Sequence, residues 1–111
     1  MTSKSEKRIS SRRSLQIRVV VTSKLIDPVE ARTIDLSRTG ICVYTQDKLK
    51  VGEIYTVTFD VMQRGSIRKL SLQAEVVFCT YRRTGDFKVG MRFLETDPAS
   101  DALMAEFTQN N

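Results

Sequence analysis

The chain has 111 residues, which is enough for one domain with a modest core, and it contains no histidine. The lack of histidine excludes histidine-based acid–base catalysis and most transition-metal sites, and we expect neither a catalytic nor a metal site. Its two cysteines, Cys42 and Cys79, are too few for a disulfide framework. There is no apolar run long enough to span a bilayer and no secretory signal pattern, so we expect a cytoplasmic protein.

The charge is concentrated at the N-terminus. Residues 1–18 carry a net charge of +5, which equals that of the whole chain, so residues 19–111 are balanced. A basic segment on a neutral body indicates an anionic partner, namely a nucleotide, a nucleic acid or a membrane surface, and a solvated tail is the alternative. We expect residues 1–7 to form a flexible arm, and we expect residues 1–12 to have little fixed structure in the free protein.

The body of the chain shows the alternation of apolar and polar residues that is typical of β-strands. The predicted strands are Leu15–Thr22, Val29–Ile34, Ile41–Thr45, Ile54–Val61, Ile67–Tyr81 and Phe87–Leu94. Turns are expected at Asp27-Pro28, 35–40, 50–52, 63–66 and 83–86, and Arg82 and Arg83 are expected to be solvated at the last turn. The long fifth strand is centred on the apolar residues Leu70, Leu72, Ala74, Val76 and Phe78.

Six short strands joined by turns predict an all-β fold, a six-stranded antiparallel β-barrel. The segment from Thr96 to Asp101 then supplies capping residues and a proline, so a short C-terminal helix is expected within residues 96–111. The predicted domain organisation is therefore the arm (1–7), the barrel with the preceding basic residues (8–95), and the helix with a tail (96–111).

Two short segments carry the chemistry of a possible binding site. Arg8-Ile-Ser-Ser-Arg12 supplies guanidinium groups, which pair with phosphate oxygens and with the O6 and N7 atoms of guanine. Asp35-Leu-Ser37-Arg-Thr-Gly40 supplies a carboxylate, a hydroxyl and a turn glycine. A carboxylate accepts hydrogen bonds from the N1 and N2 donors of guanine, so the two segments together suit a guanine nucleotide.

These segments, in this order before a β-rich chain, resemble the PilZ domain, a bacterial receptor module for cyclic di-GMP. The resemblance rests on the Arg-x-x-x-Arg segment, on the Asp-x-Ser-x-x-Gly segment, and on Val89-Gly90-Met-Arg92-Phe93 in the last strand. It implies a six-stranded barrel with a C-terminal helix, and a ligand that carries two guanines and two phosphates.

The resemblance also implies roles for individual residues. Arg8 and Arg12 would bind phosphate and guanine, Asp35 and Ser37 would bind a guanine, and Gly40 would allow the close turn through a positive φ. Phe78 stands where many members carry tryptophan, and Lys7 favours binding of a stacked pair of ligands. The full set of expected ligand-binding residues is Lys7, Arg8, Arg12, Arg13, Asp35, Ser37, Gly40, Phe78, Gly90 and Arg92.

The implied function is a receptor that orders its basic arm on the ligand and acts through an unidentified effector protein. Two alternatives remain open: a basic small barrel that binds nucleic acid, and a PilZ-like adaptor that binds no nucleotide. The charge-neutral body and the low aromatic content argue against nucleic acid. An enzyme is not expected, because the chain lacks histidine and a glycine-rich phosphate loop; no cofactor is expected either.

Overall fold

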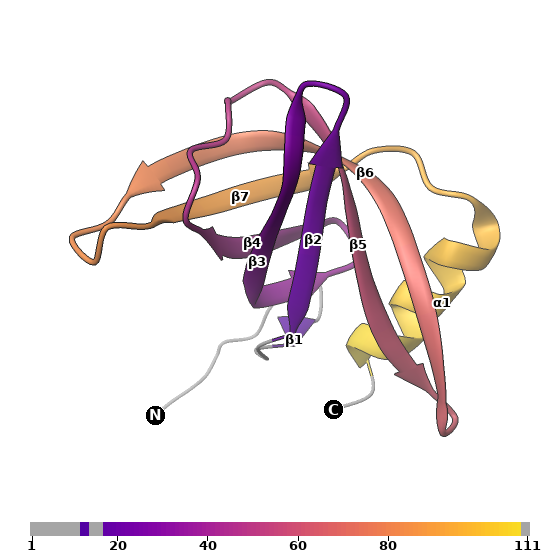
Figure 1. Ribbon diagram of the computed structural model, residues 1–111. Helices are drawn as coiled ribbons and strands as arrows, with labels where there is room; N and C mark the ends of the chain where they lie inside the picture. Colours follow the sequence, from indigo (N-terminus) through magenta and orange to yellow (C-terminus); the bar gives the residue numbers. More distant parts are fainter. Residues whose placement is uncertain (1–11, 14–16, 110–111) are drawn as a thin grey trace.

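The computed structural model describes residues 12–13 and 17–109 (Figure 1). Within them, the strands are β1 (Arg12–Arg13), β2 (Arg18–Ser23), β3 (Ile26–Ser37), β4 (Gly40–Thr45), β5 (Ile54–Gln63), β6 (Ser66–Tyr81) and β7 (Phe87–Phe93), and the helix is α1 (Pro98–Gln109). The expected arm lies outside the described residues, as do Leu15 and Gln16 at the start of the first predicted strand.

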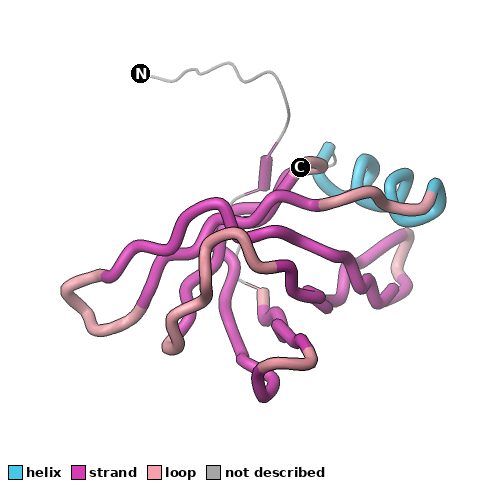
Figure 2. The backbone as a smooth tube through the Cα atoms, turned by 90° about the horizontal axis from the view of Figure 1, so that it is seen from above, coloured by secondary structure: helices cyan, strands magenta, loops and turns pink. Residues whose placement is uncertain are grey.

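The strands form one antiparallel sheet in the order β1-β3-β2-β5-β6-β7-β4, and an additional pairing between β3 and β4 closes six of them into a ring (Figures 1 and 2). Closure leaves few unpaired strand edges. The prediction of a six-stranded antiparallel barrel with a short C-terminal helix is confirmed. The two-residue strand β1, which pairs with the end of β3 and is not one of the six ring strands, was not predicted.

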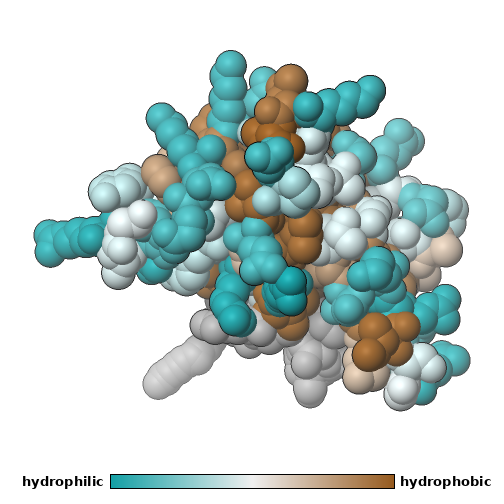
Figure 3. Space-filling model, viewed as in Figure 1, coloured by the Kyte–Doolittle hydropathy of each residue, from teal (hydrophilic) through white to brown (hydrophobic). Residues whose placement is uncertain are grey.

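The core lies inside the barrel because each strand buries alternate residues. In β4, Ile41 and Val43 are buried, whereas their neighbours Cys42 and Tyr44 are only partly buried and lie on the outer face. Residues that are paired across strands share a face, so this alternation assigns the inner and outer sides of the neighbouring strands as well. The molecular surface, viewed from the same side as in Figure 1, is mostly hydrophilic, with apolar areas between polar side chains (Figure 3).

The first predicted turn was misplaced. Asp27 and Pro28 lie within β3, and the turn falls at Lys24 and Leu25 instead. Proline has no N–H to donate, so a strand accepts it only where no ladder hydrogen bond is needed. Pro28 meets this condition because the register between β2 and β3 shifts at this point, where the pairing passes from Val21 to Ser23.

Two β-bulges change the face on which later residues lie. In β3, Thr33 and Leu36 are both buried, and the register shift between Thr33 and Asp35 turns Asp35 to the outer face. In β6, the shift between Val76 and Phe78 does the same for Phe78, which is 40% exposed. Strict alternation therefore ends at the bulge, and Phe78 does not continue the inward-facing row of Leu70, Leu72, Ala74 and Val76.

The helix α1 contacts β1, β3 and β5 at the lower end of the barrel in Figure 1. It buries Met104 and Thr108 completely, and the Thr108 hydroxyl donates a hydrogen bond to the carbonyl oxygen of Met104 at 2.8 Å. A short helix needs such tertiary packing, because its own hydrogen bonds stabilise it only marginally in water. Through its contacts with β1 and β3, the helix lies against the strands that contain Arg12 and Ser37.

Candidate functional site

The last residue of the first charged segment meets the second segment in the fold. Strand β1 pairs antiparallel with the end of β3, with Arg12 opposite Ser37 and Arg13 opposite Leu36. The last arginine of the first segment thus lies beside the serine of the second, although 25 positions separate them in the sequence. The backbone pairing is the observation that joins the two segments; Lys7 and Arg8 lie outside the described residues, and the side chains of Arg12 and Arg13 are not described.

The loop between β3 and β4 is held by the hydroxyl of Ser37, a residue that is 6% exposed. Ser37 Oγ accepts a hydrogen bond from the Thr39 N–H at 3.3 Å and donates one to the Gly40 carbonyl oxygen at 3.4 Å. The Thr39 carbonyl oxygen accepts a hydrogen bond from the Phe93 N–H at 2.9 Å. Ser37 therefore shapes the loop, and its remaining capacity for a ligand is limited by these bonds.

Gly40 is required by close packing of backbones. A Cβ atom at this position would lie 2.5 Å from the carbonyl oxygen of Met91 in β7, which is far closer than real Cβ contacts. Its φ is not positive, since the glycines with positive φ are Gly52, Gly65 and Gly85. The expected positive φ at Gly40 was therefore wrong, and the glycine serves the approach of β4 to β7.

Four residues form a row across the outer face of the barrel. Pairing places Asp35 of β3 opposite Cys42 of β4, Cys42 opposite Gly90 of β7, and Gly90 opposite Phe78 of β6. Three of the predicted site residues, Asp35, Gly90 and Phe78, are thereby brought onto one surface. The row has an acidic end on β3, the strand that pairs with β1, and an aromatic end on β6, with Cys42 and Gly90 between them.

The aromatic end of the row is in direct contact with the glycine. A Cβ atom at Gly90 would lie 2.2 Å from a ring carbon of Phe78, so the ring covers the space that a side chain would fill. An aromatic ring on a cross-strand glycine shields backbone that would otherwise be exposed. Phe78 is 40% exposed, and an exposed aromatic surface of this kind can stack on a base.

Arg92 lies in the next row of the outer face, with Gly40 opposite on one side and Glu75 on the other. Its guanidinium forms an ion pair with Glu75, and its side chain is 58% exposed. This neighbouring carboxylate competes for the positive charge of Arg92. The contribution of Arg92 to ligand binding stays a prediction.

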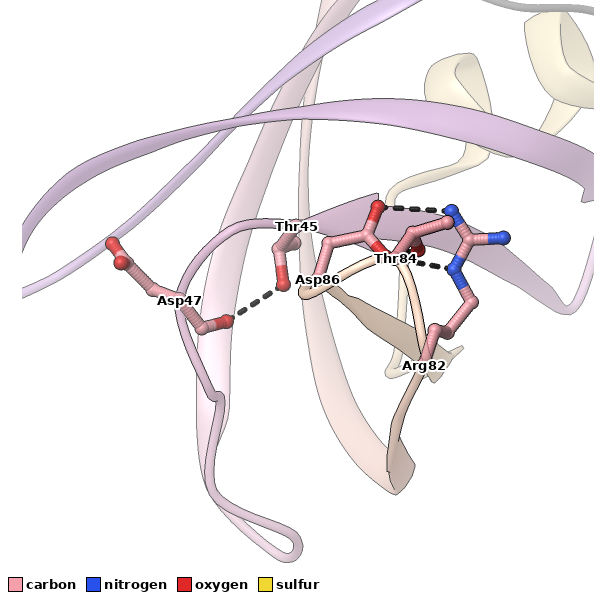
Figure 4. A network of polar contacts seen from close by, with 5 residues as sticks. All are labelled: Thr45, Asp47, Arg82, Thr84 and Asp86. Carbon is pink, nitrogen blue, oxygen red and sulfur yellow. Dashed lines mark hydrogen bonds and ion pairs between the residues drawn. The ribbon is translucent and has the colours of Figure 1, made fainter.

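On the other side of the row lies a pocket of about 380 Å³ lined by Arg18, Glu30, Ala31, Arg32, Tyr44, Thr45, Gln46 and Asp86. Arg82 stacks on the ring of Tyr44, with its guanidinium carbon 3.7 Å from the ring centroid. Asp86 holds this arginine through two hydrogen bonds of 2.8 and 2.9 Å (Figure 4). The expectation that Arg82 is solvated at a turn was wrong, because it is fixed from both sides.

The same figure shows two further hydroxyls in this region. Thr84 donates a hydrogen bond of 2.6 Å to Asp86, and Thr45 donates one of 2.7 Å to the Asp47 carbonyl oxygen. The pKa of Asp86 is lowered to about 2, mainly by the hydrogen bonds from Arg82 and to a smaller extent by the one from Thr84. The carboxylate therefore stays ionised over the physiological range. Sequence reasoning missed this network, because a hairpin turn alone does not reveal which strand its side chains reach.

Neither a metal site nor a membrane-crossing helix is found in the described part of the chain. Residues 12–13 and 17–109 contain no cluster of three or more histidine, cysteine, aspartate or glutamate side chains that could hold a metal ion. In the same residues, no helix has the length and apolar character needed to cross a bilayer.

Comparison with known proteins identifies the family. The PilZ domain model matches residues 4–110, almost the whole chain, and the chain therefore belongs to the PilZ domain family. None of the curated proteins matches the sequence significantly.

Solved structures agree with the fold. The inhibitor of motility from Bacillus subtilis (MotI/DgrA) matches with a TM-score of 0.77 and 14% sequence identity over 96% of this chain, which spans only 51% of that protein. The PilZ domain of YcgR from Escherichia coli, solved with c-di-GMP, matches with a TM-score of 0.72 and 14% identity, covering 94% of this chain and 90% of that one. The PilZ domain of CeSA from a cellulose-synthesizing bacterium matches with a TM-score of 0.61 and 18% identity over 88% and 94%.

Proposed function

We propose that this PilZ domain binds cyclic di-GMP on the outer face of the barrel, where β1, β3, β4 and β7 meet. The observation that carries the proposal is the pairing of Arg12 with Ser37, which brings the backbone of the last arginine of the first segment beside the Asp35–Gly40 loop. Membership in a family that includes a c-di-GMP-bound domain from YcgR supports the choice of ligand.

The roles follow from the chemistry of the groups. Arg8 and Arg12 bind phosphate oxygens and the O6 and N7 edge of a guanine, with Lys7 and Arg13 adding positive charge. Asp35 accepts hydrogen bonds from the N1 and N2 donors of a guanine. Ser37 and Gly40 shape the loop between β3 and β4, Gly90 makes room for the ring of Phe78, and Phe78 and Arg92 border the surface.

The energetics allow the arm to be ordered by the ligand. Fixing the backbone of a residue costs about 1–2 kcal/mol. Hydrogen bonds to charged groups contribute about 1.5–3 kcal/mol each, so a few arginine–phosphate contacts offset the ordering of a short segment. The domain then presents an altered surface to an effector protein and performs no chemistry on the ligand.

Isothermal titration calorimetry with cyclic di-GMP tests the proposal, with GMP and cyclic AMP as ligand controls. Arg12→Ala and Asp35→Ala are expected to weaken binding at least tenfold, which corresponds to the loss of one charge-assisted contact. Arg68→Ala and Asp60→Ala are matched controls. Both residues are exposed, Arg68 on β6 and Asp60 on β5, and neither belongs to the row from Asp35 to Phe78. Equal affinities in all four variants contradict the assigned site.

The same titration gives the stoichiometry. Two ligands per chain are expected if Lys7 favours a stacked pair, and Lys7→Ala should then bind a single ligand. Binding of long single-stranded nucleic acid without preference for the cyclic dinucleotide would instead support the nucleic-acid alternative. Absence of binding to either would support an adaptor that needs no nucleotide.

A further inference from the structure

The loop between β3 and β4 carries a cation that contacts the C-terminal helix. Arg38 follows Ser37 directly, and its Nη2 atom lies 3.1 Å from the Oδ2 atom of Asp101 in α1. The two residues are 63 positions apart in the sequence, so the contact joins the loop to the helix. Both side chains are about half exposed, at 47% and 46%.

The helix is held by polar contacts at two places. Besides Asp101 near its start, Glu106 accepts a hydrogen bond of 2.7 Å from Gln63 and lies 3.5 Å from Arg64. Glu106 contacts the hairpin between β5 and β6, whereas Asp101 contacts the candidate binding loop between β3 and β4. The helix also contacts both β1 and β3, which carry the two halves of the site.

We propose that Arg38 is a further ligand-binding residue and that Asp101 competes with the ligand for it. The inference rests on the proposed function, because it requires an anionic ligand at this loop. A phosphate group offers the guanidinium the same bidentate acceptor as a carboxylate does. An exposed ion pair contributes little to stability, so exchange of Asp101 for a phosphate costs little.

The exchange has a consequence for α1. When Arg38 turns to the ligand, the first turn of the helix loses its contact with the loop, while the contact at Glu106 is kept. Binding and helix attachment are then coupled, and the coupling must act equally in both directions. Loosening the helix start by mutation should therefore strengthen ligand binding.

Calorimetry with cyclic di-GMP on the full chain tests the competition. Asp101→Asn keeps the shape of the side chain but removes its charge, and it should strengthen binding about two- to fivefold, the value of an exposed ion pair. Arg38→Ala should weaken binding about tenfold or more, the value of a charge-assisted contact. In the Arg38→Ala background, Asp101→Asn should have no effect.

Glu106→Gln is the matched control, since it removes the same charge from the same helix but at the contact with the hairpin. It should leave the affinity unchanged. Hydrogen–deuterium exchange distinguishes the competition from a purely structural role of Arg38. Amide exchange in residues 98–103 should increase on addition of cyclic di-GMP to the wild type and remain unchanged in Arg38→Ala.

The outcomes separate the two proposals. If the wild type binds the ligand and Asp101→Asn binds with equal or lower affinity, the competition is wrong while the proposed function stands. An equal gain in Glu106→Gln also overturns it, because the effect would then reflect net charge alone. Absence of binding by the wild type overturns both.

Discussion

Replacing Gly40 with alanine tests the reason for a glycine in the candidate binding loop. The new Cβ atom would lie 2.5 Å from the Met91 carbonyl oxygen, 3.5 Å from its carbonyl carbon and 3.6 Å from the Cα atom of Arg92. All three neighbours are backbone atoms of β7, which is paired on both sides, so β4 and β7 must move apart.

Overpacking of this kind costs about 1–3 kcal/mol. For a domain of 111 residues, each kcal/mol lowers the Tm by about 4 °C, so the expected decrease is about 4–12 °C. Thermal unfolding followed by circular dichroism measures it. The same variant should bind cyclic di-GMP more weakly, because separation of the two strands displaces the outer row.

Asparagine substitutions distinguish steric contact from backbone conformation. Gly65 has a φ of +80°, and no atom lies within 4 Å of the position that a Cβ atom would take there. Asparagine is tolerated in this region of φ. Gly65→Asn should therefore cost little, while Gly40→Asn should cost at least as much as Gly40→Ala. A Tm for either Gly40 variant within about 2 °C of the wild type would refute the reasoning.

Three further variants probe the surroundings of the site. Asp86→Asn should lower the free energy of unfolding at pH 5 but not at pH 2. The pKa of Asp86 is about 2 in the folded protein instead of 3.8, so the stabilising effect of the ionised carboxylate is lost as the pH falls from 3.8 to 2. Urea unfolding at both pH values measures this difference. Phe78→Ala should destabilise the domain by about 1–2 kcal/mol, less than a buried phenylalanine would, because the ring is 40% exposed but covers Gly90; chemical unfolding with an unchanged midpoint would contradict the contact. Ser37→Ala should cost about 1 kcal/mol through the loss of the hydroxyl bonds to Thr39 and Gly40, and Ser71→Ala, at an exposed hydroxyl on β6, should cost less in the same assay.

Much of the fold could be predicted from local patterns. Alternating apolar residues placed six strands, and the Gln63–Ser66 segment indicated a hairpin turn, in which Arg64 and Gly65 both have positive φ. Among the expected capping residues, Asp97 caps α1, since its Oδ2 atom accepts a hydrogen bond from the Ser100 N–H at 3.2 Å. These features depend on residues that are neighbours along the chain, and the sequence specifies such neighbours directly.

The arrangement of the candidate site could be predicted only in part. The order and spacing of the two charged segments indicated a PilZ domain, and the family model confirms it. The sequence could not show that Arg12 pairs with Ser37, nor that Arg38 reaches Asp101, because both contacts join distant positions.

The two bulges show most clearly what the tertiary structure decided. An alternating pattern assigns Asp35 and Phe78 to the same side as the buried residues before them, Thr33 and Val76. One extra residue in each strand turns both side chains outward, where they share a row with Gly90. A bulge forms where the partner strand requires a change of register, so the sequence of one strand cannot determine it. The amino-acid pattern specified the strands and the chemistry of the side chains; pairing between strands determined which of those side chains lie on the outer face of the barrel.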